Sequence, residues 1–178
     1  MNNYLLGVFK RGGKIMDLKI NKEKFEIFLE VTKALNKQGI IPILFGSLGL
    51  NKIIGEFGEV NDIDILVLPE FIKEKWQNLI KTMEELKFEL KDEKEHEFIK
   101  NGEIIAFGNQ NDLVRDFKLD LTSLITSEQK RVRFKELSAE QYLLCYQFML
   151  RDTYRQEKRG SADQGKIKLI KKYLEKDK

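Results

Sequence analysis

Two aspartates separated by one residue, Asp62 and Asp64, are the residues best suited to chemistry in this sequence. They begin an alternating run, Asp62 to Leu68, which predicts a strand with both carboxylates on one face and Ile63 and Ile65 on the other. Side chains two residues apart on a strand lie about 6 to 7 Å apart, so both carboxylates can reach one or two divalent cations. A surface pair at the start of a strand is the alternative, but the apolar flanks predict a core strand, in which carboxylates need compensation.

A Gly-Ser pair, Gly46-Ser47, is the second feature that could carry chemistry. It follows a short apolar run, Ile40 to Phe45, and precedes Leu48 to Ile54, which is long enough for about two helical turns. Glycine lets the backbone approach a ligand, and the free N–H groups at a helix start attract anions. A phosphate-binding turn beside a carboxylate pair predicts a site for a metal-bound polyphosphate.

Together these two segments resemble the nucleotidyltransferase superfamily with the DNA polymerase beta-like catalytic core. The motifs that carry the resemblance are Phe45-Gly46-Ser47-Leu48-Gly49-Leu50 and Asn61-Asp62-Ile63-Asp64-Ile65-Leu66-Val67. The chain is similar to the small bacterial branch, which includes aminoglycoside and lincosamide nucleotidyltransferases and nucleotidyltransferase-like toxins. The resemblance and the order of predicted elements imply an α+β fold, with a small mixed β-sheet, packed helices and a C-terminal two-helix segment.

The resemblance also implies an activity, the metal-dependent transfer of a nucleoside monophosphate from a nucleoside triphosphate to a hydroxyl group. The acceptor is unknown and is a small molecule, a protein or an RNA. By this resemblance Asp62 and Asp64 bind Mg²⁺ or Mn²⁺, while Gly46 and Ser47 hold phosphates of the triphosphate. The alternative is a catalytically silent nucleotide- or partner-binding module of the same fold, for example a toxin-like or regulatory protein.

A third carboxylate would, by the resemblance, complete the metal site and help to activate the acceptor hydroxyl. Alternating apolar and polar residues over 117–122 predict a strand that places Asp120 on its polar face, so Asp120 is the candidate. Asp116 and Glu103 compete with it. An exposed strand carboxylate without a catalytic role is the alternative interpretation of Asp120.

Basic residues gather in the last third of the chain. From residue 131 onward there are 13 basic and 7 acidic residues. Arg155 and Lys158 are three positions apart and share a helix face. A solvated face is one interpretation, and the resemblance makes them candidates for binding the triphosphate or the acceptor. Four further lysines are predicted to be the basic end of the last helix, favoured by its dipole: Lys166, Lys168, Lys171 and Lys172.

The elements that must position these residues follow from periodicity and turn residues. Asn21 is predicted to cap a first helix that ends at Gly39, and a second helix is predicted over 69–86. Asn101-Gly102 predicts a tight hairpin, because both residues accept the positive φ of a type I′ turn. Two capping boxes predict the last helices: Ser138 with Gln141 for 139–159, and Ser161 with Gln164 for 162–175.

Length and composition limit the class of protein. With 178 residues, of which 42% are hydrophobic and 34% charged, the chain has the proportions of a single globular domain. No apolar run approaches the roughly 20 residues of a membrane helix, so we expect no membrane partner. The single cysteine, Cys145, fits a reducing compartment, and we expect a cytoplasmic protein. A net charge of +3 does not indicate a nucleic-acid partner.

Three segments are expected. Residues 1–15 fit no predicted element, and we expect them to be a non-native or disordered extension ahead of a true start at Met16. Residues 16–135 form the nucleotidyltransferase-like α/β core, and residues 136–178 form the helical segment packed on it. Nucleophilic acyl transfer is disfavoured, because Ser47 has no plausible histidine base and Cys145 falls inside a predicted helix.

Overall fold

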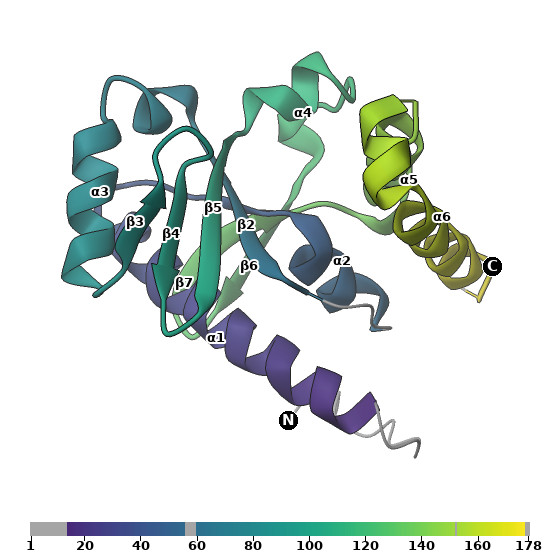
Figure 1. Ribbon diagram of the computed structural model, residues 1–178, viewed down its shortest axis with the longest axis horizontal. Helices are drawn as coiled ribbons and strands as arrows, with labels where there is room; N and C mark the ends of the chain where they lie inside the picture. The colour runs from purple at the N-terminus through teal and green to yellow at the C-terminus, as the bar shows by residue number, and fades with distance from the viewer. Residues whose placement is uncertain (1–13, 56–59, 152, 177–178) are drawn as a thin grey trace.

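The computed structural model describes residues 14–55, 60–151 and 153–176, except for the side chains at 14–20, 153–156, 158 and 159. Within these residues the strands form one 7-stranded mixed sheet in the order β3-β4-β5-β2-β1-β7-β6, with helices packed on it (Figure 1). The predicted α+β class, with a mixed sheet and two C-terminal helices, is confirmed. No helix of this described part is long and apolar enough to cross a membrane.

The strands and helices follow one another along the chain with these bounds. The strands are β1 Ile43–Leu44, β2 Asp62–Val67, β3 Glu89–Asp92, β4 Glu97–Lys100, β5 Glu103–Asn109, β6 Ile125–Gln129 and β7 Val132–Glu136. The helices are α1 Lys14–Lys37, α2 Gly46–Ile54, α3 Trp76–Glu85, α4 Asn111–Arg115, α5 Ala139–Met149 and α6 Thr153–Lys176, with the 3₁₀ helices η1 Pro69–Ile72 and η2 Leu121–Ser123.

β1 and β2 are the central strands of the sheet. β2 pairs in parallel with β5 and antiparallel with β1, and β1 pairs in parallel with β7. β1 begins only at Ile43 because Pro42 has no N–H to donate to the ladder. The carbonyl of Pro42 still accepts a hydrogen bond of 2.8 Å from the backbone N–H of Lys135. A proline next to a central strand is therefore tolerated, because it lies just before the paired residues Ile43 and Leu44.

Hairpins form both ends of the sheet. The predicted turn at Asn101-Gly102 is confirmed, with φ values of 53° and 84° between β4 and β5. The β6–β7 hairpin turns at Lys130 and Arg131, which also have positive φ values of 52° and 63°. Lysine and arginine are not typical turn residues, so the sequence does not indicate this hairpin.

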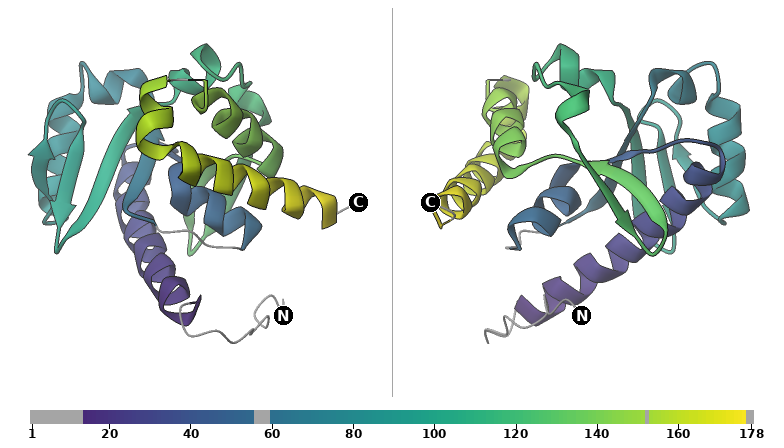
Figure 2. Two further views of the ribbon diagram at one scale, coloured as in Figure 1. Left: turned by 45° about the vertical axis from the view of Figure 1, so that its right-hand side comes forward. Right: turned by 180° about the vertical axis from the view of Figure 1, so that it is seen from behind.

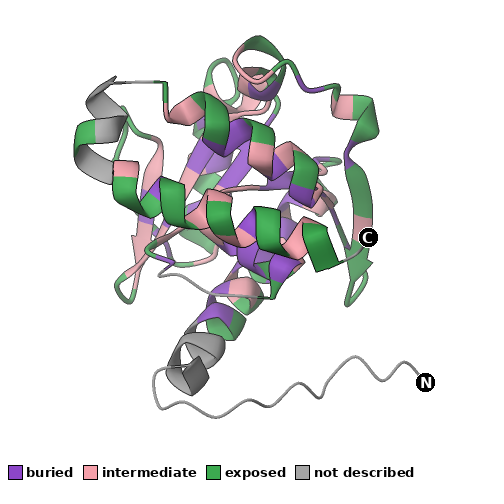
Figure 3. Cartoon of the chain, turned by 90° about the vertical axis from the view of Figure 1, so that its right-hand side faces the viewer, coloured by how far each residue is buried: buried purple, intermediate pink, exposed green. Residues whose placement is uncertain are grey.

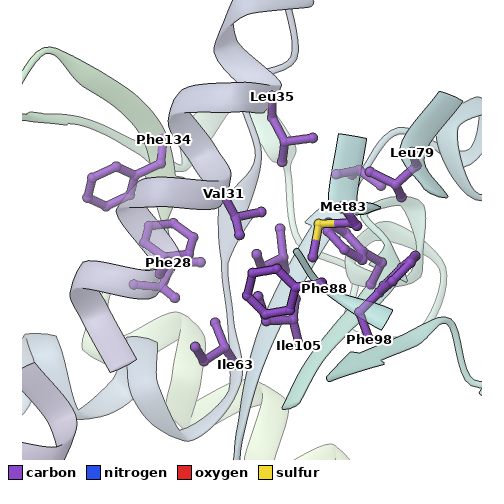
Figure 4. Close-up of a cluster of buried hydrophobic side chains, with 14 of the residues drawn as sticks. Phe28, Val31, Leu35, Ile63, Leu79, Met83, Phe88, Phe98, Ile105 and Phe134 are labelled. Carbon is purple, nitrogen blue, oxygen red and sulfur yellow. The ribbon is translucent and has the colours of Figure 1, made fainter. Parts of the chain in front are cut away.

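One hydrophobic core lies between the sheet and helices α1 and α3. Phe28, Val31 and Leu35 of α1 recur at helical spacing and are fully buried (Figure 4). The ring of Phe28 meets that of Phe134 edge to face, with 5.2 Å between centroids. Ile63 belongs to the same core, so one face of β2 packs against α1 and α3.

A second core lies on the opposite side of the sheet, under α2, α5 and α6. Leu66 of β2 and Leu50 of α2 pack there with Tyr142 of α5 and Ile170 of α6. Figures 1 and 2 show α5 and α6 beside α2, away from α3. Figure 3, seen from the side of α5 and α6, shows exposed residues on their outer faces. This second core brings α6 next to the Gly-Ser turn.

Several predicted boundaries are wrong. α1 begins at Lys14, so Asn21 is a buried helical residue and not a cap, and residues 1–13 of the predicted extension lie outside the described part. The helix predicted over 69–86 is divided into η1 and α3, because Lys73 has non-helical angles (φ −128°, ψ −97°). The Ser138 capping box is confirmed, whereas Ser161 lies inside α6 and starts no helix.

Gly49 generates the first prediction, because it allows α5 to pack closely on α2. A Cβ at position 49 would lie 2.1 Å from the hydroxyl oxygen of Tyr142. We expect Gly49→Ala to lower the free energy of unfolding by about 1 to 3 kcal/mol, the usual cost of overpacking. Urea unfolding of Gly49→Ala, with and without Tyr142→Phe, measures it. Tyr142→Phe removes the nearest atom and should recover part of the loss; no recovery in the double variant would contradict this account.

Candidate functional site

The carboxylates of Asp62 and Asp64 lie on one face of β2, as predicted. Ile63 and Ile65 are fully buried on the other face, while both aspartates are half-buried. Asp62 and Asp64 share their face with Leu66, which belongs to the second core. The acidic pair therefore points toward the side of the sheet that carries α2, α5 and α6.

The Gly-Ser turn places the start of α2 against Asp64. The backbone N–H of Phe45 donates to the carbonyl of Asp64 at 3.0 Å, and Gly46 follows with φ +63°. A Cβ at position 46 would lie only 1.7 Å from Oδ2 of Asp64 and 2.6 Å from its Cγ. Only glycine fits both the positive φ and this contact, so the carboxylate of Asp64 lies directly beside the first residue of α2.

A lysine from the C-terminal helix completes this contact region. Nζ of Lys166 donates to Oγ of Ser47 at 2.9 Å and lies 5.0 Å from the ring centroid of Tyr146. Lys166 was predicted to be only part of the basic end of the last helix, but it lies in the middle of α6 and contacts Ser47. The side chains of Arg155 and Lys158, the predicted basic residues of this site, lie outside the described part of the structure.

Helical spacing in the sequence indicates the face of α6 on which Lys166 lies. Lys166 precedes the fully buried Ile170 by four residues, so both lie on the face of α6 that contacts the second core. Lys168 lies off that face and is exposed. Helical phase, rather than the number of lysines, separates the residue at the site from those in solvent.

The charges at the start of α2 are arranged for an anion. Phe45, at the cap position, gives no side-chain cap to the helix N–H groups. The helix dipole adds a partial positive charge there, so the ammonium of Lys166 has the unfavourable sign unless negative charge lies nearby. Asp64 supplies one such charge, and a bound phosphate would supply more while accepting from the helix N–H groups.

The strand predicted over 117–122 is wrong, and this changes the position of Asp120. Residues 118–120 have no regular structure, and Asp120 caps η2. Its exposed carboxylate accepts from the N–H of Thr122 at 2.8 Å and from its hydroxyl at 2.7 Å. The hydrogen bond from the Thr122 side chain is the main cause that lowers the pKa of Asp120. Aspartate commonly makes such local bonds in turns, and here they replace the strand.

The two competing acids are also engaged elsewhere. Asp116 accepts two hydrogen bonds of 2.7 Å from Arg115, and the Arg115 side chain lowers the pKa of Asp116. Glu103 lies on the α1 side of β5 and pairs with Lys24. In residues 14–55, 60–151 and 153–176, no group of three or more His, Cys, Asp or Glu side chains could hold a metal ion.

The neighbouring strand β5 places apolar residues beside the acidic pair. In the parallel register Ile104 lies opposite Asp62, and Ala106 lies opposite Asp64. Gly108 continues this face, since a Cβ there would meet a methyl group of Leu66 at 2.7 Å. Asp62 and Asp64 therefore form a pair that no carboxylate of β5 extends.

The chain is similar in sequence to a protein of Bacillus subtilis. It is 36% identical over 148 residues to "Uncharacterized protein YnaI" of Bacillus subtilis (strain 168), a match that covers 83% of this chain and 95% of that protein. The chain belongs to the YnaI family. No family model matches the chain, and no solved structure gives a significant match. The match to YnaI assigns no activity to the chain.

Gly46 generates the second prediction. We expect Gly46→Ala to lower the free energy of unfolding by at least about 2 kcal/mol, because the new Cβ adds a steric conflict with Asp64 to the cost of positive φ. The matched control is Gly55→Ala, where φ is +65° but nothing lies within 4 Å of a Cβ. The control should lose only about 1 kcal/mol by chemical denaturation. Equal losses would show that the Asp64 contact is absent in solution.

Cys145 generates a third prediction, on reactivity. It is fully buried in α5, and burial raises the pKa of its thiol to about 12. At pH 8 roughly one molecule in 10⁴ carries the thiolate, so a disulfide reagent should label the native protein slowly. We expect labelling to become fast in denaturant and to accelerate about tenfold per pH unit in the native state. Immediate stoichiometric labelling of the native protein would contradict the burial of α5.

Proposed function

We propose that the chain is a metal-dependent nucleotidyltransferase that transfers a nucleoside monophosphate from a nucleoside triphosphate to a hydroxyl acceptor. The observation that carries the proposal is the convergence at the start of α2. There the Asp64 carboxylate lies against Gly46, and the Lys166 ammonium bonds to Ser47. A carboxylate, a hydroxyl, an ammonium and the N–H groups of a helix start are what a metal-bound triphosphate requires.

The acidic pair suits a hard divalent cation. Both donors are carboxylates on one strand face, and oxygen ligands are those that Mg²⁺ and Mn²⁺ prefer. Asp62 and Asp64 would hold the metal, and its charge would neutralise phosphate oxygens during transfer. The position of Asp64 beside Gly46 would keep a bound metal next to phosphates held at the start of α2.

The phosphates would be held by α2 and α6 together. The first N–H groups of α2 and the hydroxyl of Ser47 would donate to phosphate oxygens, and Lys166 would add a positive charge. Lys166 comes from the C-terminal segment, so binding would depend on the docking of α6 on α2. Arg155 and Lys158, on the same helix, remain further candidates for the triphosphate or the acceptor.

The chemical step is then mainly one of positioning. The acceptor oxygen attacks the α-phosphorus, the bond from that phosphorus to the bridging oxygen breaks, and pyrophosphate leaves. The hydroxyl proton passes to a base or to water. The residues at the site align the triphosphate and stabilise its charge, which is how proteins accelerate phosphoryl transfer.

A second candidate function follows from the apolar surface beside the pair. Ile104 and Ala106 occupy the β5 positions next to Asp62 and Asp64, where a third carboxylate would be adjacent. Two carboxylates are enough to bind a metal–nucleotide complex but leave the acceptor hydroxyl without a nearby base on β5. This observation favours a catalytically silent nucleotide-binding module of the same fold.

The fourth prediction tests the shared binding site. Thermal unfolding should be measured with each of the four ribonucleoside triphosphates, with and without Mg²⁺. A triphosphate at about 100 times its dissociation constant adds roughly 2.7 kcal/mol, which should raise the midpoint by a few degrees. Asp62→Asn/Asp64→Asn should lose the Mg²⁺-dependent part of the shift. Lys166→Ala should reduce the shift, while the matched control Lys168→Ala, two residues along the same helix, should keep it.

Two outcomes decide between the proposals. Pyrophosphate release or self-labelling from an α-labelled triphosphate, lost in Asp62→Asn/Asp64→Asn, supports the transferase. A Mg²⁺-dependent shift without turnover across small-molecule, protein and RNA acceptors supports the silent module. No shift with any triphosphate would refute both functions.

A further inference from the structure

We propose that Lys24 is a positioning residue that aligns Asp62 for metal binding. This inference rests on the proposed function, because it assigns a role toward the metal that Asp62 and Asp64 would hold. Lys24 lies on α1, on the side of the sheet opposite the acidic pair, and has no contact with the reacting groups.

Lys24 is an unusual residue for the interior of this protein. It is 5% exposed, although lysine is almost never fully buried unless it is paired. Its Nζ donates to Oε2 of Glu103 and, at 3.3 Å, to the backbone carbonyl of Asn61. One ammonium thus joins α1 to the first residue of β5 and to the residue directly before β2.

The bond to Asn61 acts on Asp62 through the peptide plane. The carbonyl of Asn61 and the amide nitrogen of Asp62 belong to the same planar peptide group. A hydrogen bond that holds this carbonyl therefore also fixes the peptide plane, and with it the direction in which the Asp62 side chain points. Asp62 pairs with Ile104, which directly follows Glu103, so the ion pair fixes both strands at the level of Asp62.

Stability alone is a poor reason for this arrangement. Withdrawing the Lys24 ammonium from water costs free energy, and its partner Glu103 keeps 32% of its side chain exposed, so the pair itself adds little stability. An apolar pair would fill the same space but could not hold the Asn61 carbonyl. Only Lys24 can donate the hydrogen bond to the carbonyl of Asn61, which is part of the peptide group that joins Asn61 to Asp62.

The positive charge of Lys24 and its proposed positioning role predict opposite effects on cation binding when Lys24 is removed, which makes the role testable. Lys24 is positive, so removing it should tighten cation binding at Asp62 if charge alone matters. If Lys24 positions Asp62, its removal should weaken cation binding, as loss of an outer-sphere partner usually does. The double substitution of Lys24 and Glu103 leaves the net charge unchanged and isolates position from charge.

The experiment is Mn²⁺ titration of the full chain, with free Mn²⁺ measured by electron paramagnetic resonance. We expect Lys24→Met/Glu103→Met to fold and to bind Mn²⁺ about 10-fold more weakly than the wild type, and Lys24→Met to weaken binding as well. Lys22→Met, an exposed lysine on the same helix, is the control and should bind as the wild type does. Thermal midpoints of all variants confirm folding.

The outcomes separate this inference from the function on which it rests. Wild-type binding that Asp62→Asn/Asp64→Asn does not reduce would refute the metal site and the positioning role together. Binding that depends on the two aspartates but is unchanged or tighter in the folded double variant would refute the positioning role alone. Weakened binding in the double variant, with the Lys22 control unchanged, supports it.

Discussion

Asp64 can lie against the first residue of α2 only because position 46 has no Cβ. Gly46 has a positive φ and directly faces the carboxylate, and the next residue, Ser47, begins the first turn of the helix. Because of this steric constraint, the carboxylate of Asp64 on β2 is in direct contact with the N-terminus of α2. The positions of Ser47 and Lys166 relative to the acidic pair all depend on it.

The two faces of β2 have separate tasks. Ile63 and Ile65 pack against the core under α1 and α3, which fixes the strand in the centre of the sheet. The other face carries Asp62 and Asp64, beside the core that α2, α5 and α6 form. Because side chains alternate along a strand, the rigidity of the packed face is transmitted to the carboxylates. The C-terminal helices then bring a basic residue to a site whose other parts lie within residues 46–64.

Local patterns predicted the parts of the fold that depend on neighbours in the sequence. The alternation at 62–68, the Asn101-Gly102 turn and the Ser138 capping box each act over a few residues, so the sequence shows them directly. The β6–β7 turn was missed because Lys130 and Arg131 adopt positive φ only under the constraint of their paired strands. Asp120 was misplaced because its bonds to Thr122 compete locally with strand formation.

In the candidate site too, the residues set by local patterns could be predicted and those set by distant contacts could not. Asp62, Asp64, Gly46 and Ser47 belong to two short motifs and could be proposed from sequence. For Lys166 the helical spacing to Ile170 indicates only that it lies on the packed face of α6. Its contact with Ser47, 119 residues away in the sequence, depends on the packing of α6. Lys24 was missed for a similar reason, since its partner Asn61 directly precedes β2 and its partner Glu103 begins β5.

The most direct test is a crystal structure of the protein with Mn²⁺ and a triphosphate that cannot be cleaved at the α–β bond. The anomalous signal of Mn²⁺ locates the metal without reference to the protein coordinates. We predict a manganese peak bridging the carboxylates of Asp62 and Asp64, with phosphate oxygens at the start of α2 within hydrogen-bond distance of Ser47 and Lys166. A metal or triphosphate bound elsewhere, with the start of α2 bearing no phosphate, would contradict a single metal–phosphate site at this position.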